Sequence, residues 1–162
     1  MKSFLQFIII TLLAFSVSAK PKKGVKIDVT LNPAGSFTIN ARLKGSLKKK
    51  GDMYIADKLV TKVSSFKTGV DLRDDHTKKK MNFKKFPSVT VTDIRAKKNK
   101  GIAKIKIFNK TKKIQFTYKD LNEKYAQAYF NISLKEFGIG GINYMGVGVE
   151  DTVKISATVK KK

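Results

Sequence analysis

The chain has 162 residues, with no cysteine and one histidine, and its 35 basic against 12 acidic residues give a formal net charge of +23. This length fits one domain, and the composition excludes disulfides, thiolate metal sites and histidine-rich metal sites. The charge favours an anionic neighbour such as a lipid head group, a cell-wall polymer or nucleic acid. However, 32 of the basic residues are lysines spread along the chain, which favours a soluble, self-repelling surface over specific nucleic-acid recognition.

The first nineteen residues have the pattern of a secretory signal peptide. Lys2 supplies the positive start, residues 4–15 form an apolar run, and Val-Ser-Ala at 17–19 is a small-residue cleavage site. The run is too short for a confident membrane span. We therefore expect 1–19 to be removed and a domain at 20–162 to be periplasmic or secreted; the alternative is an uncleaved anchor.

Three stretches before residue 66 alternate apolar and polar residues with the period of two of a β-strand. They are expected at 25–31, 37–48 and 55–63. In the third stretch Ile55, Leu59 and Val63 are expected to face inward. That register also places Asp57 and Thr61 on the apolar side, and a β-bulge could shift it.

Residues 66–87 interrupt the alternation, and we predict one short helix there. Asp71 is expected to cap the helix start, with Asp74 three residues later as in a capping box. Lysines at 78–80 suit the negative end of the helix dipole, and Pro87 prevents the helix from continuing.

Five further alternating stretches follow the helix. They are expected at 89–97, 103–107, 114–119, 126–133 and 153–160. Short turns join most of them, as in an antiparallel meander. The exception is a Gly-rich loop at 138–148, which lacks the phosphate-loop pattern and is expected to take a tight path across one end of the fold.

Eight strands that are each apolar on one face can bury that face by closing into a barrel. We therefore predict an all-β, eight-stranded antiparallel barrel with one short helix between strands three and four; a two-sheet sandwich is the main alternative. The lysines are expected to face water, because a lumen of eight-strand width could not hold so many unpaired like charges. An outer-membrane barrel with a lysine-lined lumen is excluded on this ground.

An eight-stranded barrel can be filled by its side chains or can hold one ligand. The predicted inner face includes Phe37, Ile39, Ala41, Ile105, Phe116, Tyr118, Ala128 and Phe130. Ala126 and Ala128 are small where a filled core would favour Leu, Ile or Val, which indicates open space. We expect no catalytic or metal site and no enzymatic activity, because nothing marks a serine partner for His76.

Three short segments, SSFKTG at 64–69, LRDDH at 72–76 and FP at 86–87, resemble the central motif of the YceI-like family. That motif is a strand end, Thr-Gly, Arg-Asp-x-His and an aromatic residue before proline. LKEFGI at 134–139, followed by a final strand, is similar to the family's C-terminal pattern. The resemblance spans nearly all of 20–162 and implies an exported, lipocalin-like barrel that binds long isoprenoid lipids in its lumen.

The resemblance implies a bound lipid such as a polyprenyl chain or a quinone, and no other cofactor. Thr68, Arg73, Asp74 and His76 are the candidate head-group or rim residues. Arg73 and Asp74 are expected to form a structural pair that pins the helix over a barrel end; alternatively Arg73 meets a polar lipid head.

Expected partners are an apolar lipid and an anionic envelope surface, without specific nucleic acid. The oligomeric state stays open, with a dimer among the options. A second hypothesis is a basic surface module that binds anionic cell-envelope polymers and has a filled barrel.

Overall fold

The computed structural model describes residues 20–162, so the expected signal peptide at 1–19 lies outside the described residues. The strands are β1 (Gly24–Asn32), β2 (Ser36–Ala41), β3 (Leu43–Lys44), β4 (Lys48–Lys50), β5 (Met53–Lys62), β6 (Ser88–Lys97), β7 (Lys100–Ile107), β8 (Lys110–Asp120), β9 (Tyr125–Ser133), β10 (Asn143–Tyr144), β11 (Val147–Val149) and β12 (Thr152–Lys160). One α-helix, α1 (Asp71–Lys80), and two 3-10 turns, η1 (Val63–Ser65) and η2 (Lys135–Phe137), complete the fold. Within 20–162 no helix is long and apolar enough to cross a membrane.

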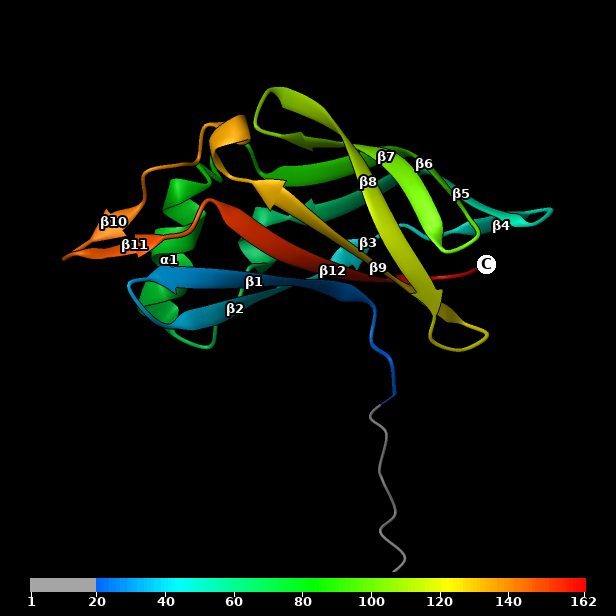
Figure 1. The fold of residues 1–162 in the computed structure, drawn as a ribbon, viewed down its shortest axis with the longest axis horizontal. Helices are drawn as coiled ribbons and strands as arrows, with labels where there is room; N and C mark the ends of the chain where they lie inside the picture. Colours follow the sequence, from blue (N-terminus) through cyan, green and yellow to red (C-terminus); the bar gives the residue numbers. More distant parts are fainter. Residues whose placement is uncertain (1–19) are drawn as a thin grey trace, which may run out of the picture.

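The strands form an antiparallel barrel. The sheet runs β1-β12-β9-β8-β7-β6-β5, with β2 paired to the free side of β1 and both β3 and β4 paired to β5. The strands β2, β3 and β4 follow one another directly and act as one bent strand. This strand joins β1 to β5 and so closes the barrel (Figure 1). This arrangement confirms the predicted eight-position barrel with a helix between strands three and four, and it contradicts the sandwich.

Apolar side chains point into the barrel and lysines point out. In β7, Ala103, Ile105 and Ile107 are buried, whereas Lys104 and Lys106 between them are exposed. This two-residue alternation is what a strand with one face in water requires. The same pattern in the other strands places the core inside the barrel, as the sequence predicts.

The alternation is interrupted at the same level of the two neighbouring strands β5 and β6. Asp57 and Lys58 are both exposed, so the buried positions pass from Ala56 to Leu59. Opposite them, Asp93 has a φ of 55° beside a register shift in the pairing of β6 with β7. The expected inward position of Ile55 is therefore wrong, because the irregularity places its neighbour Ala56 inside.

Helix α1 begins without the predicted cap. The residue before its first turn is Val70, which offers no side-chain cap, and Asp71 is already helical. Three lysines lie in the last turn, as predicted. The expected capping by Asp71 is wrong because Asp71 is the first residue of the helix. Asp74 accepts hydrogen bonds from Thr68 in the loop before the helix, as described below.

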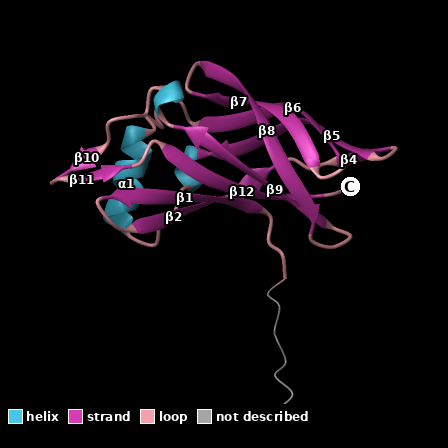
Figure 2. Cartoon of the chain, viewed as in Figure 1, coloured by secondary structure: helices cyan, strands magenta, loops and turns pink. Residues whose placement is uncertain are grey.

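The Gly-rich loop contains a short hairpin, β10–β11. Its second strand pairs with the end of β1, where Leu31 lies opposite Val149. The hairpin and α1 lie at the same end of the barrel, and the C-terminus lies at the opposite end (Figures 1 and 2). The hairpin extends the sheet at this end of the barrel.

Candidate functional site

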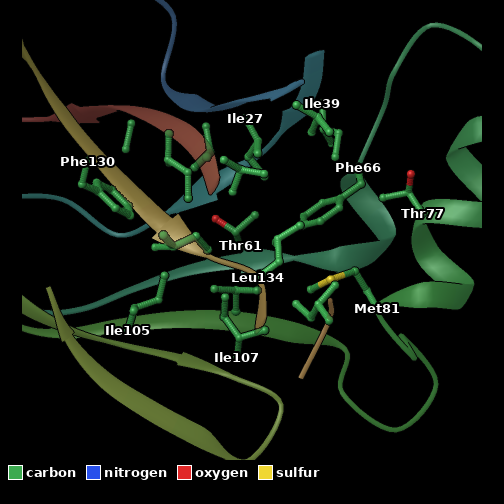
Figure 3. A pocket seen from close by; sticks show the side chains of 18 of the residues that line it. Ile27, Ile39, Thr61, Phe66, Thr77, Met81, Ile105, Ile107, Phe130 and Leu134 are labelled. Carbon is green, nitrogen blue, oxygen red and sulfur yellow. The ribbon is translucent and has the colours of Figure 1, made fainter. Parts of the chain in front are cut away.

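The barrel encloses an elongated cavity of about 990 Å³. Seven of the eight predicted inner-face residues line it: Phe37, Ile39, Ile105, Phe116, Tyr118, Ala128 and Phe130. The eighth, Ala41, is buried but does not line the cavity. Residues on β6 and β12, including Val89, Val91, Val153 and Ile155, complete walls that are almost entirely aliphatic and aromatic (Figure 3).

A row of small side chains leaves the space open. Val25, Ala157, Ala128 and Tyr118 lie opposite one another in successive strands and line the cavity. Three of these four positions carry alanine or valine, and such side chains reach only a short way into the barrel. The cavity therefore follows from side-chain size at matched registers, as the small residues Ala126 and Ala128 indicate.

Polar and aromatic groups close the barrel at the end near the C-terminus. The rings of Tyr54 and Tyr118 pack edge to face with centroids 5.7 Å apart. Lys161 donates to Asp120 at 2.7 Å and to the Tyr54 hydroxyl at 3.4 Å. Burial alone would lower the pKa of Lys161, but these two partners hold its pKa above the ordinary value. The ammonium stays charged and ties the last residues of the chain across this end.

The opposite end is the mouth of the cavity, which we define as Val70, Leu72, Arg73 and Lys80 of the α1 region with Met145 and Val147 of the hairpin. All six line the cavity. The Arg73 guanidinium lies 4.7 Å from the centroid of the Phe37 ring, so it stacks on the inner wall. Because four of the apolar lining residues here are also exposed, the cavity reaches the surface at the mouth.

The four predicted rim residues divide into two pairs. Arg73 and His76 line the cavity, whereas Thr68 and Asp74 do not. Asp74 is 2% exposed and forms its ion pair with Lys67 at 3.0 Å. The expected Arg73–Asp74 pair is therefore wrong: Arg73 turns to the cavity wall and Asp74 turns to the loop before the helix.

Asp74 fastens α1 to that loop. Its carboxylate accepts hydrogen bonds from the Thr68 backbone N–H at 2.6 Å and from the Thr68 hydroxyl at 2.8 Å. The Thr68 backbone N–H is the main cause that lowers the pKa of Asp74 to about 2, and burial opposes it. The Thr-Gly and Arg-Asp-x-His segments thus meet in a structural joint next to Arg73 and His76, which both line the cavity.

Few polar groups reach deep into the cavity. Thr61 is the buried polar residue among the described lining residues, and no carboxylate belongs to that lining. Figure 3 shows Thr61 among Ile27, Phe66 and Leu134. The described residues contain no group of three or more side chains suited to hold a metal ion. Such a site suits an elongated apolar molecule with its polar end at the mouth.

Fold and cavity together define a lipocalin-type β-barrel with an apolar interior. The sequence model of the YceI-like domain matches residues 13–160. The chain therefore belongs to the YceI-like family. Comparison with curated proteins gave no match.

Solved structures share this fold at low sequence identity. One is a polyisoprenoid binding domain from Saccharophagus degradans, with a TM-score of 0.57, 11% identity, and coverage of 84% of this chain and 91% of that one. Another is a cysteine mutant of the Campylobacter jejuni YceI protein with a monobromobimane guest, with a TM-score of 0.58, 15% identity, and coverage of 99% and 97%. These likenesses agree with the barrel derived from the strand pairing.

Proposed function

We propose that this protein is a non-enzymatic carrier that holds one long, apolar, isoprenoid-type lipid in the barrel. The observation that carries the proposal is the cavity of about 990 Å³ with its aliphatic and aromatic walls. That volume lies at the upper end of the roughly 300–1,000 Å³ typical of small-molecule sites. The polyisoprenoid binding named for the Saccharophagus degradans domain supports the same ligand class.

Desolvation would drive binding. Each 100 Å² of apolar lipid surface removed from water contributes about 2.5 kcal/mol, from which the cost of ordering the chain is subtracted. A strand of nine residues spans roughly 30 Å, so the barrel is long enough for an extended chain. We propose Phe37, Ile39, Ile105, Phe116, Ala128 and Phe130 as wall contacts and Arg73, His76 and Lys80 as the groups nearest the polar end of the lipid.

The second hypothesis, a polymer-binding surface around a filled barrel, is weakened by the cavity. The lysine surface itself remains, so the two modes must be separated by experiment. Binding of an anionic polymer weakens steeply as salt screens the lysines, whereas transfer of an apolar chain into the cavity does not.

The test is a titration with a fluorescent polyprenyl alcohol at low and at physiological ionic strength. We expect saturation near one probe per protein, with a Kd that salt leaves nearly unchanged. As a control, an anionic polysaccharide should compete weakly and only at low salt. Absence of saturable probe binding, together with strong salt-sensitive polysaccharide binding, would reject the lipid carrier and favour the surface module.

We also propose that the protein is exported and acts in the periplasm or outside the cell. The support is the sequence pattern at 1–19 described above. N-terminal sequencing of protein recovered from the envelope fraction should begin at Lys20. Recovery of an intact Met1 on folded, exported protein would favour an N-terminal anchor instead.

A further inference from the structure

We infer that the mouth is a docking surface for an anionic lipid bilayer, through which the lipid passes directly between membrane and cavity. This inference rests on the proposed lipid-carrier function and adds the place where loading occurs. It starts from the distribution of exposed apolar side chains. Single exposed apolar residues are ordinary on a soluble protein, but a cluster around a cavity opening is not.

The large exposed apolar residues of the described chain gather at the mouth. Four of the six are Val70 at 46%, Leu72 at 66%, Met145 at 86% and Val147 at 41% exposed, and all four also line the cavity. They belong to two segments far apart in sequence, the start of α1 and the β10–β11 hairpin, which lie at the same end of the barrel (Figure 1). Folding therefore brings together apolar groups that the core does not use.

Basic side chains accompany this apolar cluster. The segment 66–87 contains seven basic and three acidic residues. Of its acidic residues, Asp74 and Asp71 are already contacted by Lys67, at 3.0 and 3.8 Å. Lysines at 78–80 form no ion pair within the described chain, and Arg73 and Lys80 stand in the mouth itself.

Exposed apolar side chains beside lysines that form no ion pair match the chemistry of a bilayer whose head groups are anionic. Leu72 and Met145 can enter the apolar side of the interface while the cations meet phosphates. In that orientation the cavity opens toward the acyl chains, so an isoprenoid chain can enter without crossing water. A second copy of this chain fits less well, because pairing two mouths would bring like charges together.

Flotation with lipid vesicles tests the inference on protein purified from its own host. The mouth variant combines Leu72→Ser and Met145→Ser, and the control combines Ile102→Ser and Tyr129→Ser, which are the other large exposed apolar residues of the described chain. On vesicles of phosphatidylcholine mixed with phosphatidylglycerol, we expect the mouth variant to bind roughly tenfold or more weakly than wild type. The control should bind like wild type, and pure phosphatidylcholine vesicles should bind all proteins weakly.

Equal vesicle binding by wild type and the mouth variant would overturn the inference. A second outcome would also overturn it: wild type is a dimer, the mouth variant is a monomer, and neither protein floats with vesicles. Binding of farnesol by the wild-type protein in solution separates the two proposals, because it tests the cavity without a membrane. If no protein takes up farnesol but flotation still depends on the mouth, the lipid-carrier function fails and the docking surface stands.

Discussion

Ala128 lies between Ala157 and Tyr118 in the row of small residues, and it faces the cavity. A larger side chain there would project into open space instead of into packed neighbours. A substitution at Ala128 therefore distinguishes an open ligand-binding cavity from a packed core.

Replacing Ala128 with Trp should remove lipid binding and leave the fold nearly as stable. The urea midpoint is expected to stay close to that of wild type, because the indole enters the cavity. Overpacking of a filled interior would instead cost roughly 1–3 kcal/mol. Tyr129→Trp is the matched control, since the neighbouring side chain lies on the outer face and should change neither property. A strongly destabilised Ala128→Trp protein would show that the interior has no spare room.

Asp74 gives the α1 joint a defined pH dependence. Its folded pKa of about 2 lies below the ordinary 3.8, so its ionised form stabilises the fold above pH 3.8 and that contribution disappears as the pH falls through 2. Asp74→Asn should therefore lower the free energy of unfolding by a constant amount at neutral pH. The difference from wild type should shrink between about pH 4 and pH 2.

Urea unfolding of both proteins at stepped pH values measures this difference. Asp71→Asn serves as the control, because the Asp71 side chain is fully exposed and its contact with Lys67 is long, at 3.8 Å. Its difference from wild type should stay flat and near zero. A pH-independent deficit for Asp74→Asn would mean that hydrogen-bond geometry, and not the charge, fastens the helix.

Among the elements, those with long alternating patterns are the ones the sequence predicts well. The eight strand positions, the inward apolar face and the helix all follow from period and turn signals. The register of β5 does not, because a one-residue shift at Asp57 and Asp93 depends on pairing across strands. Asp57 on the apolar side signals an irregularity, but it does not fix where the register changes. Where alternation persists on both sides of such a shift, the inward-facing residues of each half of the strand are predictable within that half. Which set of residues in one half faces the same side as a given set in the other half is not predictable.

Sequence reasoning predicts Arg73 at the rim but misses the apolar part of the mouth. Strands β10 and β11 are two and three residues long, too short to display a period. Leu72 and Met145 lie outside the alternating stretches, so nothing in their local sequence relates them to a cavity. The available signal is Met145, an apolar residue beside Gly146 in the Gly-rich loop.

Closure of the barrel depends on the bend in its second strand at Gly45. There φ is +106°, and a Cβ atom would lie 2.7 Å from the Lys58 carbonyl oxygen. Gly45→Ala should therefore cost more than about 2 kcal/mol of unfolding free energy, from backbone strain and from the displaced β5. Gly51→Ala, at a φ of +61° with nothing within 4 Å, should cost roughly 1–2 kcal/mol.

Chemical denaturation of the two glycine variants provides the comparison. Equal losses of stability would show that the contact with Lys58 plays no part, and that the positive φ alone accounts for both costs.

For the whole molecule, the net charge of +23 is a source of electrostatic repulsion. Repulsion among lysines destabilises the compact state, and salt screens it. We expect Tm to rise as ionic strength increases from low values to about 0.15 M. A variant with glutamine at all three exposed positions of β4, Lys48, Lys49 and Lys50, should melt higher at low salt and respond less to added salt. A fall in Tm with salt would mean that the ion pairs outweigh the repulsion.

Native mass spectrometry of the protein from its own host tests the lipid-carrier account most directly. Wild type should appear with one non-covalent apolar adduct per chain, and fragmentation of that adduct should give isoprenoid-type masses. Ala128→Trp protein prepared in parallel should be free of the adduct, whereas Tyr129→Trp protein should retain it. Wild-type protein that is folded but uniformly without lipid, or equal adducts on wild type and Ala128→Trp, would contradict the proposed use of the cavity.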